Sequence, residues 1–350
     1  MPRIAVIMPT RNRVHLIGRA IRSLGQQTFQ DFELLVGDDG CTDGTPEVIE
    51  RKAKAAGISF RIINENGDHI GLPSMRNRLI RESDSEFVAV LDDDDEALPD
   101  RLEVGIRMME SNPKIAVTGG AMSVRNDTTG CETLWTRPTA DMDIRRFALS
   151  DCAFWHSTTM MTRSHLPSQE PYDETMARGE DTLLWAQMTK QEDIKFANTN
   201  KITTVLHIHK RQANEAEVTT WNRELHKRLV KSNAEFLETQ GAPKDLAVAD
   251  WLATRRWWHV KPDSIPDPER VRAVYSLLNR WGRRIAGNSL ALAIEQKNPW
   301  RGKLDLRGPA SLKRRIIALR TLRVASAIQK QGKRMTTAIR KPTPKERPTT

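Results

Sequence analysis

Four consecutive aspartates, Asp92 to Asp95, follow the short apolar segment 87–91 (FVAVL). Neighbouring carboxylates repel one another, and a bound divalent cation removes that penalty. Carboxylate oxygens suit Mg²⁺ or Mn²⁺, which take the rest of their ligands from water and from substrate phosphates. The alternative is a solvated acidic turn that caps the following helix, whose N-terminus favours negative charge. The run by itself is compatible with either interpretation.

Two other polar segments also follow apolar, strand-like runs: residues 9–12 (PTRN) and residues 38–45 (DDGCTDGT). Neither has the G-x-G-x-x-G or the G-x-x-x-x-G-K-[ST] pattern, which argues against a dinucleotide site and against a P-loop enzyme. A carboxylate in place of a glycine-rich phosphate loop suits contacts to a base or a ribose. A metal ion would then handle the diphosphate.

Candidate acid–base groups lie further along the chain. Glu180 and Asp181 stand at the start of a helical segment, where a carboxylate could accept a proton from a substrate hydroxyl. The alternative is a charge pair that only stabilises the helix N-terminus. Histidines at such positions are more often core or surface residues than ligands. Among His156, His207 and His209, the last is the favoured functional candidate, because it lies past the end of a strand-like stretch beside Lys210 and Arg211.

Alternating strand-like and helix-like segments must position these groups. Apolar runs predict strands at 4–8, 32–36, 60–63, 87–91 and 115–118, and helical spacing predicts helices at 14–25, 46–56, 74–82 and 99–110. This alternation predicts an α/β fold with a mostly parallel sheet that carries helices on both faces. Ligands bind at the carboxyl ends of the strands in such sheets, which is where the polar segments lie.

The net charge of +10 is unevenly distributed over the 350 residues. Residues 301–350 hold fifteen Lys and Arg and two acidic residues, a net charge of +13, while the first 300 residues hold 40 basic and 43 acidic residues. The chain therefore combines a near-neutral body with a basic tail, whose last ten residues are expected to be disordered. A basic tail suits an anionic membrane surface.

Several classes of protein are excluded by composition. Apolar runs are too short to span a bilayer or to form the core of a signal peptide. The three cysteines, Cys41, Cys131 and Cys152, are too few and too scattered for a disulfide framework or a cysteine-rich zinc site. These features favour a cytoplasmic protein, which the tail would hold at the inner face of the membrane.

The composition and the apolar pattern of the sequence change near residue 216. Helical patterns dominate from there, and six of the nine tryptophans lie between 221 and 300. This density predicts a helical subdomain with an aromatic-rich core, and the alternative is a membrane-interface or acceptor-docking face. We expect three parts: an α/β domain over 1–215, a helical, tryptophan-rich subdomain over 216–300, and a basic, partly disordered tail over 301–350.

The segment 4–45, IAVIMPTRNRVHLIGRAIRSLGQQTFQDFELLVGDDGCTDGT, resembles the opening of a family 2 glycosyltransferase with the GT-A fold. Residues 71–77 (GLPSMRN) resemble the G-x-x-x-A-R-N segment of that family, and residues 87–95 (FVAVLDDDD) resemble its strand and D-x-D metal motif. Residues 172–174 (YDE) and 179–185 (GEDTLLW) resemble its F-D-E and E-D-x-x-[LF]-W segments. Each motif is weak alone, but four in family order form a specific signal that covers residues 1–210.

The resemblance implies a role for each matching residue. The nucleotide sugar would be bound by Pro9, Thr10, Asn12, Asp39, Arg76, Asp92 and Asp93. Within this set Asp39 would face the base, Arg76 the base or the diphosphate, and Asp92 the ribose side. The metal, Mn²⁺ or Mg²⁺, would be held by Asp94, with Asp95 and His209 as further ligands, and which aspartate of the run binds it stays open. Asp181 would be the catalytic base, with Glu180 beside it.

The resemblance further implies an inverting, metal-dependent glycosyltransferase of the hexosyltransferase type. It would move a sugar from a nucleoside-diphosphate sugar, with UDP favoured over GDP or dTDP, to a hydroxyl of a glycan or lipid-linked acceptor in surface polysaccharide synthesis. Arg11, where the family has an aromatic residue, and Cys41, in place of a serine, depart from the pattern. One alternative is a nucleic-acid acceptor, which no nucleic-acid-binding motif supports. Another is a non-catalytic sugar-nucleotide-binding scaffold, which would need no general base.

Overall fold

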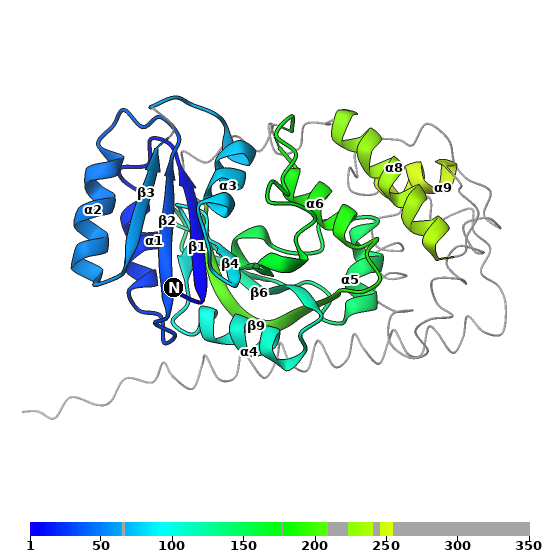
Figure 1. Cartoon of the computed structure of the whole chain (residues 1–350), viewed down its shortest axis with the longest axis horizontal. Helices are drawn as coiled ribbons and strands as arrows, with labels where there is room; N and C mark the ends of the chain where they lie inside the picture. The colour runs from blue at the N-terminus through cyan, green and yellow to red at the C-terminus, as the bar shows by residue number, and fades with distance from the viewer. Residues whose placement is uncertain (65–66, 177, 209–222, 241–245, 255–350) are drawn as a thin grey trace, which may run out of the picture. The chain divides into compact units, whose positions relative to one another are not determined.

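The computed structural model describes residues 1–64, 67–176, 178–208, 223–240 and 246–254. A nine-stranded sheet runs through this part of the chain in the order β3-β2-β1-β4-β8-β6-β9-β5, with β7 paired to β6 (Figure 1). In chain order the elements are β1 (Ile4–Thr10), α1 (Ile17–Leu24), β2 (Phe32–Asp38), α2 (Thr45–Ala56), β3 (Phe60–Asn64), α3 (Leu72–Arg81), β4 (Phe87–Val90), β5 (Glu96–Ala97), α4 (Arg101–Ser111), β6 (Ile115–Asn126), β7 (Glu132–Trp135), α5 (Asp141–Ala148), β8 (Met160–Thr162), α6 (Glu180–Met188), β9 (Lys195–Ile208), α8 (Arg223–Thr239) and α9 (Leu246–Thr254).

The first half of the sheet is parallel, as the alternation of strands and helices predicts. Strand β1 lies between β2 and β4, and Ile4 is in register with Phe32 on one side and with Phe87 on the other. All seven residues of β1 are buried, which is typical of a parallel strand covered on both faces. The predicted strands and helices up to residue 118 are confirmed, with ends that differ by a few residues.

Helices cover both faces of this half, which confirms the predicted α/β architecture. Ile4, Val6 and Met8 of β1 pack in one core cluster with apolar residues of α1, α2 and α4. The alternate residues Ala5 and Ile7 belong to a second cluster with α3, α5 and α6. Side chains alternate across a strand, and each fully buried aliphatic side chain contributes about 1.5–3 kcal/mol to stability, so both clusters stabilise the sheet.

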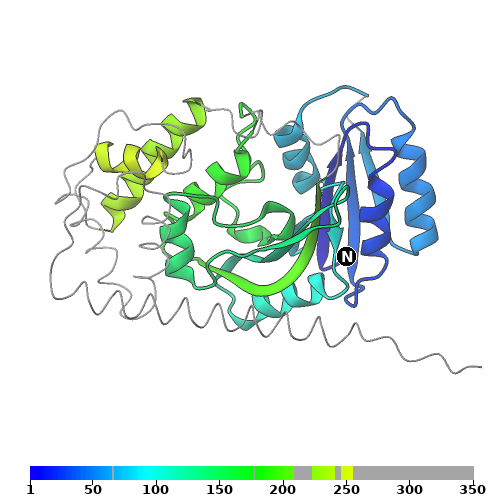
Figure 2. The ribbon, with the colours of Figure 1, turned by 180° about the vertical axis from the view of Figure 1, so that it is seen from behind.

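The second half of the sheet is mixed, so the expectation of a mostly parallel sheet holds for β1 to β4 and not throughout. Strand β8 is antiparallel to β4 and β6, and β5 is antiparallel to β9. Strand β6 continues to Asn126, beyond the predicted end at 118, and pairs in parallel with the long, curved β9 (Figures 1 and 2). Gly119 and Gly120 permit this, because a Cβ at either would lie 2.4 Å or less from a side-chain oxygen of β9.

Helices α8 and α9 belong to the same compact unit, Met1–Arg283, as the sheet. Leu225 and Leu229 of α8 pack with Leu183 of α6, and a Cβ at Gly179 would lie 2.4 Å from Leu225. The predicted boundary at 215 stays a prediction, and most of the 216–300 region and all of the 301–350 tail lie outside the described residues. None of the described helices combines the length and apolar character needed to cross a bilayer.

Candidate active site

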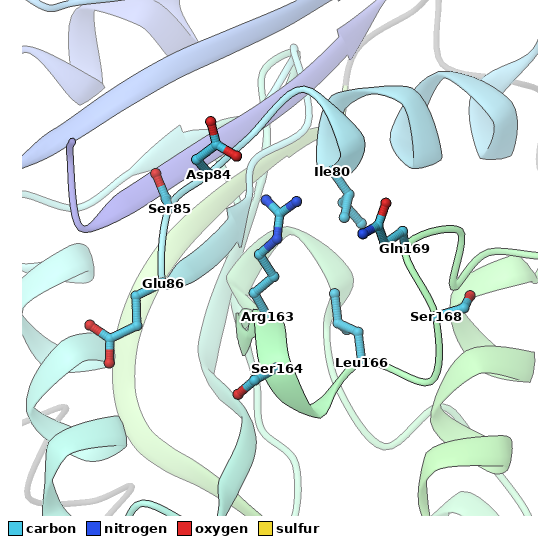
Figure 3. A pocket seen from close by; sticks show the side chains of 9 residues that line it. All are labelled: Ile80, Asp84, Ser85, Glu86, Arg163, Ser164, Leu166, Ser168 and Gln169. Carbon is cyan, nitrogen blue, oxygen red and sulfur yellow. The ribbon is translucent and has the colours of Figure 1, made fainter.

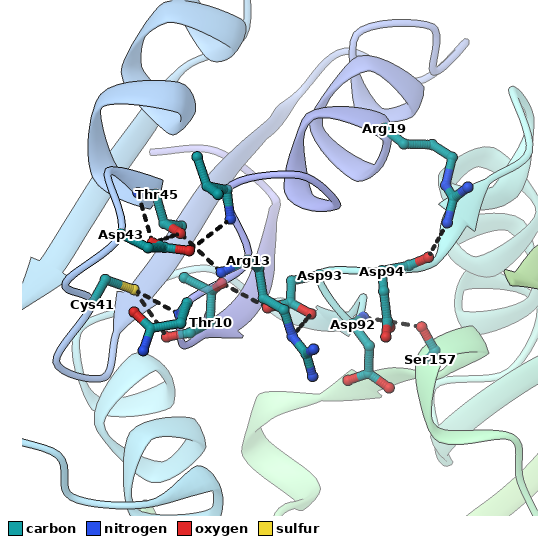
Figure 4. Close-up of polar contacts among 12 residues, drawn as sticks. Thr10, Arg13, Arg19, Cys41, Asp43, Thr45, Asp92, Asp93, Asp94 and Ser157 are labelled. Atoms are coloured by element: carbon teal, nitrogen blue, oxygen red, sulfur yellow. Dashed lines mark hydrogen bonds and ion pairs between the residues drawn. The ribbon is translucent and has the colours of Figure 1, made fainter. Parts of the chain in front are cut away.

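The carboxyl ends of β1 and β4 bring two predicted site residues into direct contact. Thr10 ends β1, and its hydroxyl donates a hydrogen bond to Asp93 Oδ2 at 2.6 Å (Figure 4). Both side chains are buried. Arg13, which the sequence analysis did not select, lies 3.5 Å from the other oxygen of Asp93. In the sequence, only its basic side chain and its place in the loop after the first strand could have indicated Arg13.

The loops after β1 and β2 hold each other. Asn12 has a left-handed backbone with φ of 55°, and its side-chain oxygen accepts a hydrogen bond from the backbone of Thr42 at 2.8 Å. Pro9 lies inside β1 in register with Gly37 and is buried, so it shapes the strand end. These contacts fix the position of Asp39, whose backbone donates to the carbonyl of Thr10 at 3.0 Å.

Asp39 is engaged with the loop that precedes α3. Its Oδ1 accepts hydrogen bonds from the backbone of Ile70 at 2.7 Å and of Gly71 at 3.2 Å, and its Oδ2 lies 2.7 Å from His69 Nδ1. These hydrogen bonds do not test the predicted contact of Asp39 with the nucleotide base. They show a role that sequence reasoning missed: Asp39 orients the start of α3, the helix that carries Arg76.

Arg76 connects the acidic run to the helix of the predicted base. Its side chain is only 4% exposed, and it pairs with Asp92 Oδ1 at 3.0 Å and with Glu180. The guanidinium also lies 5.7 Å from the ring centroid of Tyr172. Burial lowers the pKa of Arg76, but the charges of Asp92 and Glu180 raise it above its ordinary value. In this structure Arg76 therefore meets carboxylates at the place where a base or diphosphate contact was predicted.

Glu180 and Asp181 open α6 but face different surroundings. Gly179, with φ of 81°, turns the chain into the helix, and Glu180 is buried against Arg76. Asp181 is partly exposed, with Cys152 Sγ 3.7 Å from its Oδ2. Burial raises the pKa of Glu180, and Arg76 opposes that rise. Asp181 is therefore the carboxylate of the pair that a substrate could reach.

Exposure alternates along the acidic run. Asp93 and Asp95 are buried, whereas Asp92 and Asp94 are partly exposed. Burial and the charge of Asp94 raise the pKa of Asp93 to about 7. Burial also raises the pKa of Asp92, where Arg76 opposes the rise and Asp94 adds to it. Arg76 and Arg13 offset part of the charge of the run. The raised pKa values show that four adjacent carboxylates still oppose one another's ionisation, and a divalent cation would stabilise their charged forms.

The residues of the acidic run fit a divalent cation that takes part of its coordination shell from a substrate. Asp92 and Asp94 are partly exposed, and hard cations prefer carboxylate oxygens as ligands. Within the described residues no cluster of three or more His, Cys, Asp or Glu side chains is arranged to hold a metal. Hard cations of this kind commonly take the rest of their shell from water and substrate phosphates. Asp95 is 2% exposed, close to Ser157 and Arg101, and His209 lies outside the described residues.

Two side chains that sequence reasoning missed, one basic and one polar, form hydrogen bonds with the backbone of the acidic run. Arg19 of α1 donates to the backbone oxygen of Asp94 at 3.0 Å, and the hydroxyl of Ser157 accepts from the backbone of Asp92 at 3.0 Å (Figure 4). His207 pairs with Asp127 and Glu96 rather than with the run. Neither Arg19 nor Ser157 lies in a recognisable motif, so only tertiary structure could identify them.

A hollow of about 530 Å³ lies elsewhere, at the amino-terminal edge of β4 (Figure 3). Its lining includes Asp84, Ser85 and Glu86, which precede the strand, together with Arg163. None of the predicted site residues lines it. The candidate active site is therefore the opposite, carboxyl-terminal edge, where Thr10, the acidic run, Arg76 and Asp181 converge.

Comparison with protein-family models matches residues 5–167 to glycosyl transferase family 2. A GalNAc(5)-diNAcBac-PP-undecaprenol beta-1,3-glucosyltransferase of Campylobacter jejuni is 38% identical over 98 residues, which cover 28% of this chain and 31% of that relative. The UDP-Glc:alpha-D-GlcNAc-diphosphoundecaprenol beta-1,3-glucosyltransferase WfgD of Escherichia coli is 27% identical over 197 residues, which cover 56% of this chain and 73% of WfgD. The chain thus spans under a third of the first relative and nearly three quarters of the second.

Among solved structures, residues 1–349 of S. aureus TarS in complex with UDP-GlcNAc superpose with a TM-score of 0.50 at 14% identity. The match covers 80% of this chain and 92% of the TarS fragment. At that identity the likeness supports the fold alone.

Proposed function

Because residues 5–167 form a family 2 glycosyltransferase domain with the GT-A fold, we propose that the protein transfers a hexose from a UDP-sugar to a hydroxyl of a lipid-linked glycan, with inversion of the anomeric centre. Two relatives support the acceptor class, since both are named as glucosyltransferases that act on undecaprenol-diphosphate-linked saccharides. Surface polysaccharide synthesis at the cytoplasmic face of a membrane is the setting that such acceptors imply.

One observation carries the proposal: the buried Arg76 joins Asp92, at the donor side, to Glu180, the neighbour of Asp181. A glycosyl transfer needs a site for the diphosphate and a proton acceptor on opposite sides of one sugar ring. A pair of carboxylates that served only as a helix cap would not need a buried guanidinium between it and the acidic run.

The bonds and protons of the reaction can be assigned to this chain's residues. The acceptor hydroxyl gives its proton to the carboxylate of Asp181 as its oxygen bonds to the anomeric carbon. The bond between that carbon and the diphosphate oxygen breaks, and the diphosphate keeps the electron pair. Attack from the face opposite the leaving group inverts the centre. Arg76 holds Glu180 and thereby fixes the first turn of α6, which orients Asp181.

Asp94, with Asp92 beside it, would hold Mn²⁺ or Mg²⁺, and such a cation supplies charge stabilisation to the leaving diphosphate. Thr10 and Arg13 fix the buried Asp93 and thereby the backbone of the run, while Arg19 holds the carbonyl of Asp94. These contacts keep the two partly exposed carboxylates in place before a substrate arrives.

The donor and the metal can be identified together by thermal unfolding of the full chain with UDP-glucose, UDP-GlcNAc, GDP-mannose or dTDP-glucose, each with Mn²⁺ or with EDTA. We expect a UDP-sugar with Mn²⁺ at 100 times its Kd to stabilise the fold by about 2.7 kcal/mol, and thus to raise Tm by several degrees. Asp94→Asn should remove the metal-dependent part, whereas Asp84→Asn, at the opposite edge of the sheet, should not. A shift that is equal in EDTA would contradict the metal site.

The basic tail is proposed to hold the enzyme at an anionic membrane surface. Each Lys or Arg near such a surface contributes about 1 kcal/mol, so replacing Lys313, Arg314 and Arg315 with Gln in the full chain should weaken binding to phosphatidylglycerol vesicles about 100-fold. Donor hydrolysis should stay unchanged. Replacement of Arg51, Lys52 and Lys54 of α2 is the matched control. Co-sedimentation with vesicles measures both, and equal binding by the tail variant and the wild type would refute the anchor.

A further inference from the structure

Helix α8 packs along α6, the helix that carries the proposed base (Figures 1 and 2). Positions three or four residues apart on an α-helix lie on one face. Such positions of α8 contact α6 or the residue before it, with Leu225 and Leu229 near Gly179 and Leu183, and Ser232 bonded to the carbonyl of Ala186 at 3.1 Å. One face of α8 therefore follows α6 from its first turn onwards.

The turn into α6 is packed directly against α8. Gly179, with φ of 81°, immediately precedes Glu180 and Asp181. A Cβ at Gly179 would overlap with the side chain of Leu225, which is only 3% exposed. Leu225 thus fills the space beside the turn, and a shift of α8 would shift the residue that precedes the two carboxylates.

The segment 172–176, which leads towards this turn, is held on one side by α3. Asn77 of α3 is fully buried, and its side-chain amide donates to the carbonyl of Tyr172 at 2.8 Å and to Glu174 Oε1 at 2.9 Å. The backbone of Tyr172 donates back to Asn77 Oδ1 at 3.0 Å. The helix that carries Arg76 therefore fixes two alternate residues of the segment.

Arg228 of α8 holds the other two alternate residues. It pairs with Asp173 Oδ2 and donates to the hydroxyl of Thr175 at 3.0 Å. That hydroxyl donates in turn to Asp173 Oδ1 at 2.6 Å, so the three side chains form one connected set. The side chains of Arg228 and Asp173 are 30% and 28% exposed, and ion pairs with such exposure contribute little to overall stability. Their contribution is therefore to the local geometry of the segment.

We propose that α8 positions the proposed base, with Leu225 and Arg228 as positioning residues for the turn that carries Asp181. The inference rests on the proposed function, because it concerns the base of that reaction. A base must lie within hydrogen-bond reach of the proton that it accepts, and a displacement of about 1 Å can lower the rate about 100-fold. Arg76 already fixes Glu180 in the same turn, so α3 and α8 together set the place of Asp181.

Arg228→Met in the full-length chain tests the inference, since a partly exposed side chain can be replaced without unfolding the protein. Initial rates are measured with UDP-glucose and an alkyl α-D-GlcNAc diphosphate, and calorimetric titration measures UDP binding. We expect kcat to fall about tenfold, with the donor KM and the Kd for UDP unchanged. Tm should fall by no more than about 3 °C. A merely structural contact would not separate kcat from donor binding in this way.

Three further variants of α8 provide the controls. Lys227→Met removes the same charge from the neighbouring exposed position, and Glu224→Gln removes the partner of Arg228 Nε within the helix, 2.9 Å away. Neither should change kcat. Arg228→Lys keeps the charge but loses the planar fork that reaches both Asp173 and Thr175, so it should retain only part of the rate.

Hydrogen exchange gives a measurement that does not depend on transfer. The amide of Leu183 donates to the carbonyl of Gly179 at 3.0 Å and closes the first turn of α6. Arg228→Met should speed amide exchange in peptides from residues 179–188 about tenfold, because a turn held less firmly opens more often. Peptides from α3 should exchange at the wild-type rate, as should all peptides of Lys227→Met.

Equal kcat in Arg228→Met and the wild type overturns the inference, as does an equal loss in Lys227→Met or a parallel loss of UDP binding. A fall in kcat with unchanged exchange of α6 overturns it too, because the effect would then not act through the turn. The proposed function fails separately, if the wild type transfers no sugar from any donor. Exchange then decides the inference: faster exchange of α6 in Arg228→Met alone keeps the positioning role of α8, and equal exchange refutes it.

Discussion

Asp181→Asn is expected to lower kcat for sugar transfer by about 10²- to 10⁴-fold while the protein folds normally and still binds its nucleotide. An amide has the shape of the carboxylate but cannot accept the proton of the acceptor hydroxyl. Asp181 is partly exposed and accepts a hydrogen bond from Cys152 Sγ at 3.7 Å, which the amide oxygen of Asn can also accept, so the substitution leaves no buried group unpaired. Initial rates with UDP-sugar donors and calorimetric titration with UDP measure the two quantities.

Glu180→Gln and Asp193→Asn complete that experiment. Glu180 is buried against Arg76, so its replacement should lower stability and affect the rate less than the loss of the base. Asp193 is exposed after α6 and should have no effect. If Asp181→Asn transferred sugar at the wild-type rate and Glu180→Gln transferred none, Glu180 rather than Asp181 would be the base. A wild type that binds UDP and catalyses nothing would favour the scaffold alternative.

The first half of the fold follows from local pattern. Each strand and helix up to residue 118 has an apolar periodicity of its own, and parallel strands that are buried on both faces give the clearest runs. The second half of the fold depends instead on which strands pair with one another. The predicted strand ends at residue 118, yet Gly119 and Gly120, which come next, are the residues that let β9 approach β6. Such a close approach has no signature in the sequence of β6 alone.

The candidate site divides in the same way. The rule that ligands bind at strand ends correctly brought Thr10 and the acidic run together, because the strand order alone places them at one edge. The contact between Arg76 and Glu180 could not be predicted, since Glu180 lies 104 residues further along the chain. Arg13, Arg19 and their contacts likewise depend on loop conformations that a motif does not specify.

Arg76→Met is expected to lower the free energy of unfolding by about 3–5 kcal/mol, because it leaves two carboxylates without their shared counter-charge. The side chain of Arg76 is 4% exposed, and those of Glu180 and Asp92 are 6% and 35% exposed. Urea unfolding, extrapolated linearly to water, gives the difference. Arg81→Met is the control on the same helix: Arg81 pairs with Glu170 at the surface, so its loss should cost no more than about 1 kcal/mol.

The pH dependence of that deficit tests its cause. Burial already raises the pKa values of Glu180 and Asp92 in the folded protein, and loss of Arg76 removes the charge that opposes the rise. An acid whose pKa is higher in the folded state than in the unfolded state destabilises the fold above the unfolded value, near 4, and this penalty grows as pH rises towards the folded pKa. The deficit of Arg76→Met should therefore be smallest near pH 5 and largest near pH 8. A deficit independent of pH, or one no larger than that of Arg81→Met, would refute the account.

Adding Glu180→Gln to Arg76→Met should restore part of the stability, because the double variant has one buried charge fewer to leave unpaired.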